Sequence, residues 1–137
     1  MNYKQEMRIH PELDLGSSIG GTRCMIFRFW FETKNFETVV DITNPQIVGR
    51  EKWNELYIAI ENTENYTLTF STGFIDAFIE CDKNDGVVLF GCWTTSPSAR
   101  THITVRVNLS ESRQELLDCL SFFLYDEKTN DFWEPGG

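Results

Sequence analysis

The stretch THITVRVNLSESRQELLDCLSFFLY, residues 101–125, contains two hydrophobic periodicities in succession. Its first part alternates with the period of a half-buried strand, and the apolar positions are Ile103, Val105, Val107 and Leu109. Its second part changes to helical spacing, with apolar positions at Leu116, Leu117, Leu120, Phe123 and Leu124. Ser110 or Ser112 is expected to cap this helix, with Glu115 completing a capping box. The stretch therefore predicts a strand and a helix that share one apolar surface.

The chain before residue 101 is predicted to form the sheet that this helix covers. Alternating segments separated by polar turns recur along it, at residues 22–32, 36–43, 56–61, 66–70, 74–81 and 87–90. The expected fold class is α+β, with one curved antiparallel meander of about six or seven strands and one C-terminal helix packed on it. The expected organisation is a single domain made of an irregular N-terminal segment (1–21), the sheet (22–109), the helix (110–125) and an acidic aromatic tail (126–137).

Two of these segments also fit a helix. Trp53, Leu56, Tyr57 and Ile60 have helical spacing, whereas Leu56, Ile58 and Ile60 alternate. The polar residues 62–65, followed by another alternating segment, favour a strand over residues 56–61. Residues 74–81 fit either element, and the turn-like residues 82–86 favour a hairpin while leaving the helix open.

The composition is that of a folded chain with its own core. The 137 residues are 41% hydrophobic and include 11 Phe, 4 Trp and 4 Tyr, which excludes a disordered protein. No apolar run approaches the ~20 residues that cross a bilayer, and the first residues lack the hydrophobic segment of a signal peptide. We therefore expect a cytoplasmic protein with no membrane partner.

The four cysteines, Cys24, Cys81, Cys92 and Cys119, are widely spaced among apolar residues. They are predicted to be buried free thiols, and a disulfide between Cys81 and Cys92 across the expected hairpin remains an alternative. No spacing suits a zinc site, so neither a metal nor another cofactor is predicted.

The acidic charge is the main indication of a partner. The formal charge is −9, and residues 110–137 hold seven acidic residues against Arg113 and Lys128, a local net of −5. Such a charge repels phosphate backbones, so no direct nucleic-acid binding is expected, and it attracts basic protein surfaces. The predicted contact residues are Asp82, Asp85, Glu111, Glu115, Asp118, Asp126, Glu127, Asp131, Phe132 and Trp133.

No catalytic group of residues is recognisable, and we expect a protein that is not an enzyme. The histidines are His10 and His102, and His102-Ile103-Thr104 has only half of what a two-histidine phosphoesterase needs. An alternative function is nucleotide or phosphate binding by an arginine fork beside a tryptophan. The residues of that alternative site are Arg28, Trp30, Trp93, Arg100, His102 and Arg106.

The small acidic build, a curved sheet plus a helix without a catalytic site, resembles that of bacterial toxin-immunity proteins and of phage-encoded inhibitors of host defence. The resemblance implies a non-catalytic protein that neutralises a basic partner, such as a nuclease-like toxin, by occlusion. A structural component of an oligomeric assembly is the remaining alternative, and open sheet edges would then pair two copies as a homodimer.

Overall fold

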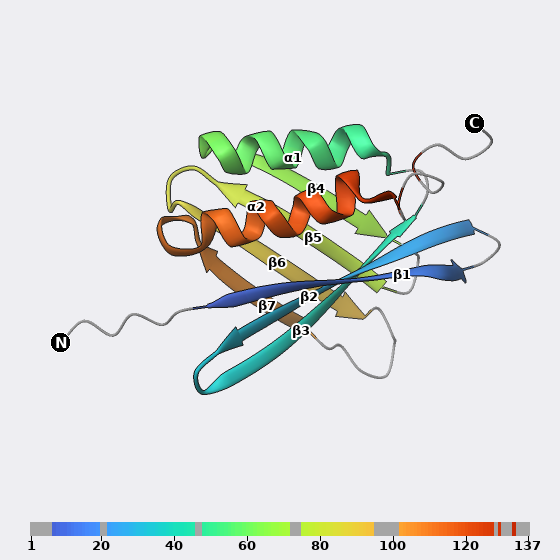
Figure 1. The fold of residues 1–137 in the computed structure, drawn as a ribbon, viewed down its shortest axis with the longest axis horizontal. Coiled ribbons are helices and arrows are strands. Elements are labelled where there is room, and N and C mark those ends of the chain that lie inside the picture. The colour runs from blue at the N-terminus through green and yellow to red at the C-terminus, as the bar shows by residue number, and fades with distance from the viewer. Residues whose placement is uncertain are drawn as a thin grey trace.

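The computed structural model describes residues 7–19, 22–45, 48–71, 75–94, 102–127, 129 and 133. They form two antiparallel sheets and two helices (Figure 1). The three-stranded sheet has the order β1-β2-β3 and the four-stranded sheet the order β4-β5-β6-β7. The strands are β1 (Arg8–Ile19), β2 (Thr22–Thr33), β3 (Phe36–Pro45), β4 (Tyr66–Ser71), β5 (Ile75–Asp82), β6 (Val87–Thr94) and β7 (His102–Asn108). The helices are α1 (Arg50–Asn62) and α2 (Leu109–Tyr125).

The α+β class is confirmed, but the predictions of one continuous sheet and one helix are wrong. The expected strand over residues 56–61 lies inside α1. Trp53, Leu56 and Ile60 are buried, whereas Ile58 is 43% exposed, so the burial follows the helical period. The polar residues after α1 end the helix instead of forming a hairpin. Thr63 adopts a left-handed φ of 52°, and the Glu64 amide donates to the Ala59 carbonyl at 2.9 Å.

The N-terminal segment that was expected to be irregular contains the long strand β1. It pairs with β2 from Arg8 opposite Glu32 to Ile19 opposite Thr22, with a register shift between Asp14 and Ser17. Its alternation is obscured in the sequence by Pro11 and by the glycines after residue 15. A proline is tolerated here because β1 is an edge strand of its sheet.

Residues 75–82 form a strand, so the predicted hairpin is confirmed and the helical alternative is not adopted. Ala77, Ile79 and Cys81 are buried, while Phe78 remains partly exposed on the other face. The turn into β6 ends at Gly86, whose φ of +63° suits glycine. All four cysteines are free, so the Cys81–Cys92 disulfide is not formed.

The strand-to-helix stretch is confirmed in β7 and α2, and the predicted apolar face of the helix is buried. The cap differs from the prediction. Asn108 is the N-cap residue and makes no side-chain capping hydrogen bond, and Ser112 leaves the helical region inside α2 with φ −129° and ψ 19°. The helix therefore begins before the predicted cap and has a kink near it.

The core lies between the two sheets and the two helices. The Phe27 ring of β2 is 4.6 Å from Trp53 of α1 and 4.4 Å from Phe123 of α2, measured between centroids. Phe29 of the same strand is 4.9 Å from Phe90 of β6. Because the inner faces of both sheets meet in this core, each sheet turns its other face outward. No helix in the described part of the chain is long and apolar enough to cross a membrane.

Candidate functional site

The acidic residues that were predicted to contact a partner lie mainly at the turn between β5 and β6 and along α2. Glu111, Glu115 and Asp118 are exposed on α2. The Leu109 amide donates to the Gly86 carbonyl at 3.0 Å, so the turn lies beside the start of this helix. Asp82 has a structural role, because its Oδ1 accepts the amides of Asn84 at 2.8 Å and Asp85 at 3.3 Å.

In the predicted aromatic tail, the structure describes the side chain of Trp133, which packs on the rest of the chain. Its Nε1 donates to the Phe123 carbonyl at 3.1 Å, and its ring centroid is 6.1 Å from that of Phe27. Asp126 is partly buried and Glu127 is exposed just after α2. Asp131 and Phe132 lie outside the described residues.

Arg28 of the alternative anion site is already held by carboxylates on the outward face of the three-stranded sheet. Its Nε and Nη2 donate to Asp41 at 2.7 and 3.0 Å, and Nη1 lies 3.6 Å from Glu12. The hydrogen bond to Asp41 and the charge of that carboxylate raise the pKa of the Arg28 guanidinium. Trp30 donates from Nε1 to the same Glu12 at 3.2 Å. Neither side chain is therefore set up to receive a phosphate.

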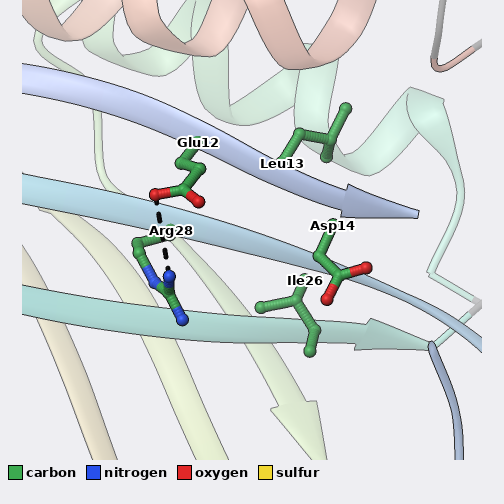
Figure 2. Close-up of a pocket in the computed structure, with 5 residues that line it drawn as sticks. All are labelled: Glu12, Leu13, Asp14, Ile26 and Arg28. Carbon is green, nitrogen blue, oxygen red and sulfur yellow. Dashed lines mark ion pairs between the residues drawn. The ribbon is translucent and has the colours of Figure 1, made fainter. Parts of the chain in front are cut away.

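A cavity of about 330 Å³ lies beside this network and is lined by Glu12, Leu13, Asp14, Ile26 and Arg28. Figure 2 shows Glu12 of β1 and Arg28 of β2 facing each other at its rim. The polar lining contains two carboxylates and one guanidinium that is already paired. The cavity therefore does not favour an anion. Across the described ranges, no group of three or more His, Cys, Asp or Glu side chains gathers as a metal site.

The structure separates Arg28 from Arg106. Arg106 lies on β7, in the four-stranded sheet, and is exposed on the outward face of that sheet. The backbone places Trp93 of β6 opposite His102 of β7, but the side chains of both residues lie outside the described part. Arg100 is also outside it. The described arginines of the alternative site thus belong to two different surfaces.

The outward face of the four-stranded sheet is the surface on which aromatic, hydroxyl and guanidinium groups come together. The strand registers arrange its side chains in rows that cross all four strands, and two neighbouring rows carry these groups. One row is Thr67, Glu80, Leu89 and Arg106, and the other is Thr69, Phe78, Gly91 and Thr104. We call these eight residues the sheet platform.

Phe78 is the centre of the platform, and Gly91 leaves room for it. A Cβ on Gly91 would come within 2.1 Å of the Phe78 Cε1 atom, so the ring lies across β6. The ring is only partly buried. An aromatic ring on a sheet face, with hydroxyl groups on both sides, can stack against another flat ring.

The charged residues of the platform are Glu80 and Arg106, and Asp76 and Asp82 of β5 lie on the same face. Glu80 and Arg106 are in the same row, separated by Leu89 of β6. Arg106 makes no ion pair with any side chain that the structure describes, unlike Arg28. The platform therefore combines one stacking surface, several hydroxyl groups and one available guanidinium.

Phe78 is not among the site residues that were predicted from the sequence. The signal that could have found it is the hairpin register. A turn that pairs Asp82 with Val87 also places Phe78 opposite Gly91. A glycine opposite an aromatic residue in a strand indicates that the ring needs the space.

No family model matches the chain, and no curated protein matches it. Among solved structures, the chain is similar to a chain in the structure of a guideRNA-binding protein complex bound to a gRNA. The two share 11% sequence identity with a TM-score of 0.47, over 85% of this chain and 90% of the other.

Two predictions do not agree with what that structure is named for, that the chain binds no nucleic acid directly and that it neutralises a basic protein. Both predictions relied on the net charge, which does not tell where the charge lies. Glu111, Glu115 and Asp118 are on α2, which packs on the inner side of the four-stranded sheet (Figure 1). The platform is on the other side of that sheet and contains Glu80, and Asp76 and Asp82 of β5 lie on the same face.

Proposed function

We propose that the protein binds single-stranded nucleic acid, with RNA as the first candidate, on the sheet platform, and that it does so without catalysis. The observation that carries this proposal is the Phe78 ring, partly exposed and lying across Gly91 in the middle of an outward sheet face. Sheet surfaces with exposed aromatic side chains are one of the common ways in which proteins stack unpaired bases.

The chemistry of the platform suits a single strand better than a duplex. An unpaired base offers its flat face to Phe78, whereas the bases of a duplex are already stacked on one another. Thr67 and Thr69 on β4 and Thr104 on β7 flank the ring and can exchange hydrogen bonds with sugar hydroxyls and phosphate oxygens. The 2′-hydroxyl of RNA adds one such partner per nucleotide, which is why RNA is the first candidate.

The acidic composition limits the contribution of electrostatic attraction to the affinity for nucleic acid. One available guanidinium neutralises about one phosphate, which corresponds to a slope of roughly −0.7 in log affinity against log salt. The net charge of −9 repels the strand, and salt screens that repulsion. These two effects oppose each other, so we expect an affinity that depends little on salt and comes mainly from stacking.

The proposal is tested by titrating a labelled single-stranded RNA of about ten nucleotides with the wild type and with Phe78→Ala and Phe78→Leu. Loss of one stacked base costs about 1–3 kcal/mol, so both variants are expected to bind roughly 5- to 150-fold more weakly. Phe78→Leu keeps an apolar side chain over Gly91, and so separates stacking from folding.

Phe36→Ala is the matched control, because Phe36 is also an exposed phenylalanine, 68% accessible, at the start of β3 in the other sheet. It is expected to bind like the wild type. Equal affinities for Phe78→Leu and the wild type, or a wild type that binds no single strand at any salt concentration, would contradict the proposal.

A further inference from the structure

The sheet platform ends at an open edge on β7. The other edge strand of the same sheet, β4, has α1 and β3 beside it, and β1 of the three-stranded sheet has α2 beside it. Strand β7 also contacts α2, the helix that follows it directly in the chain. Within the described ranges, no strand pairs with the outer side of β7. An unpaired strand edge presents a row of amides and carbonyls that another strand can join.

We propose that a second copy of this chain pairs with β7 in antiparallel fashion and completes the nucleic-acid site, an inference that rests on the proposed function. Strand β7 has seven residues, His102–Asn108. The register that pairs its whole length with itself places Val105 on the two-fold axis, beside Val105 of the second copy. In that register Thr104 of each copy lies opposite Arg106 of the other.

This register supplies positive charge that a single platform lacks. The two Arg106 side chains project from the same outward face and are diagonal neighbours, roughly 7–8 Å apart at their starting points. Long guanidinium side chains at that separation can converge on one phosphate between them. Glu80 lies two strands away from β7 in each copy, so the centre of the joined sheet carries only positive and neutral side chains.

The same geometry links dimerisation to nucleic-acid binding. Two guanidiniums near one axis repel each other until an anion lies between them, so a backbone phosphate should strengthen the pairing. By linkage, the dimer should bind the strand more tightly than the single copy does. Two platforms side by side would also offer two Phe78 rings to one continuous strand.

Substitutions of Thr104, the residue opposite Arg106, test the pairing, because opposite charges at this position should change self-association in opposite directions. Thr104→Glu places a carboxylate opposite Arg106 of the second copy, twice per dimer, and Thr104→Lys places a like charge there. Each such pair contributes about 0.2–1 kcal/mol, so self-association should strengthen about 2- to 30-fold in the first variant and weaken by a similar factor in the second. Ser71→Glu and Ser71→Lys introduce the same charges at an exposed position on β4 that lies outside the platform and away from the axis, and should leave self-association unchanged.

Sedimentation of the full chain, alone and with a single-stranded RNA of about ten nucleotides, provides the readout, and thermal unfolding verifies that each variant is folded. We expect a complex of two protein copies with one RNA, and opposite changes in self-association for the two Thr104 variants.

A strict one-to-one complex that still depends on Phe78 would overturn the β7 pairing and leave the proposed function in place. Opposite Thr104 shifts without any RNA binding would support the pairing and remove the proposed function. Dimers that are indifferent to the charge at residue 104 would overturn the pairing.

Discussion

Gly91 is the residue whose missing side chain allows the Phe78 ring to lie on the outward face. An added Cβ would come within 2.1 Å of that ring, so in Gly91→Ala the ring must move away from β6. We expect a loss of about 1–3 kcal/mol in the free energy of unfolding, measured with urea, and RNA binding weakened in parallel with Phe78→Leu.

Gly49→Ala is the matched control for this change. A Cβ on Gly49 meets no atom within 4 Å, and its φ of −84° suits any residue. Gly49 is the N-cap residue of α1, where alanine is less favourable than glycine, so we expect wild-type binding and a loss of at most about 1 kcal/mol in the free energy of unfolding. If Gly91→Ala also behaved like the wild type in both measurements, the position of the Phe78 ring would not matter.

The free energy of unfolding is expected to depend on pH through the hydroxyl group of Tyr66. Burial, and then the hydrogen bond that its hydroxyl donates to Glu55 at 2.7 Å, raise the pKa of Tyr66 from 10.0 to about 12. In this pH range the folded chain binds more protons than the unfolded chain, so stability is lost as the pH rises through it. The wild type is expected to lose more unfolding free energy between pH 10.0 and about 12 than Tyr66→Phe does. Equal losses in urea titrations of the two proteins would refute this assignment.

Single residues also show what the sequence could predict about the site. Arg28 and Trp30 alternate with the buried Phe27, Phe29 and Phe31, and this alternation indicates an outward face. Their partners could not be predicted, because Glu12 and Asp41 come from neighbouring strands whose register depends on two turns. Only the structure shows that Arg28 forms ion pairs with Glu12 and Asp41. Only the structure shows that Arg106 forms no ion pair with a described side chain.

At the scale of elements, α1 shows why a short apolar segment is ambiguous. Leu56, Ile58 and Ile60 fit a strand as well as a helix, and only the exposure of Ile58 separates the two. Trp53 decides the outcome physically. Its ring packs on Phe27 and Phe70, and its Nε1 donates to Asn44 at 3.1 Å, which fixes the start of the helix against both sheets. Such long-range contacts override local patterns.

Arg113 of α2 forms hydrogen bonds with the C-terminal end of α1, and its removal is expected to weaken the contact between the two helices. It donates to the carbonyls of Ile60 and Glu61, and its Nη2 donates to Thr63 Oγ1 at 2.7 Å. Arg113→Met removes these hydrogen bonds from carbonyls that α1 leaves unpaired at its end. We expect a loss of roughly 2–3 kcal/mol in unfolding free energy from urea titration.

Arg106→Gln removes the same charge from an exposed position that makes no described ion pair, so it is the control for Arg113→Met. Its stability is expected to lie within about 0.5 kcal/mol of the wild type. A similar small change in Arg113→Met would show that the contact between the helices does not depend on this side chain.

At the scale of the whole molecule, the sequence predicted the hairpins except the one before residue 66, but it did not predict their division into two sheets. Hairpin patterns show which strands are consecutive, and β2–β3, β5–β6 and β6–β7 all pair as neighbours in the chain. They do not show where the sheet stops. Helix α1 stands between β3 and β4, and its misassignment as a strand joined the two sheets into one.

The net charge was misleading at the same scale. A charge of −9 describes the average surface, whereas a binding site depends on one face. The two helices, which Figure 1 shows together on one side of the four-stranded sheet, carry most of the exposed carboxylates discussed above. The opposite side of that sheet presents the platform.

The central claim, that a single strand binds on the platform, is tested most directly by a heteronuclear NMR titration of the isotope-labelled chain with single-stranded RNA. The account predicts that the amide signals of Thr69, Phe78 and Arg106 shift, while those of exposed helix residues such as Glu55 and Asp118 do not. Shifts confined to the helices or to the surroundings of Arg28, with Phe78 and Arg106 unchanged, would contradict it.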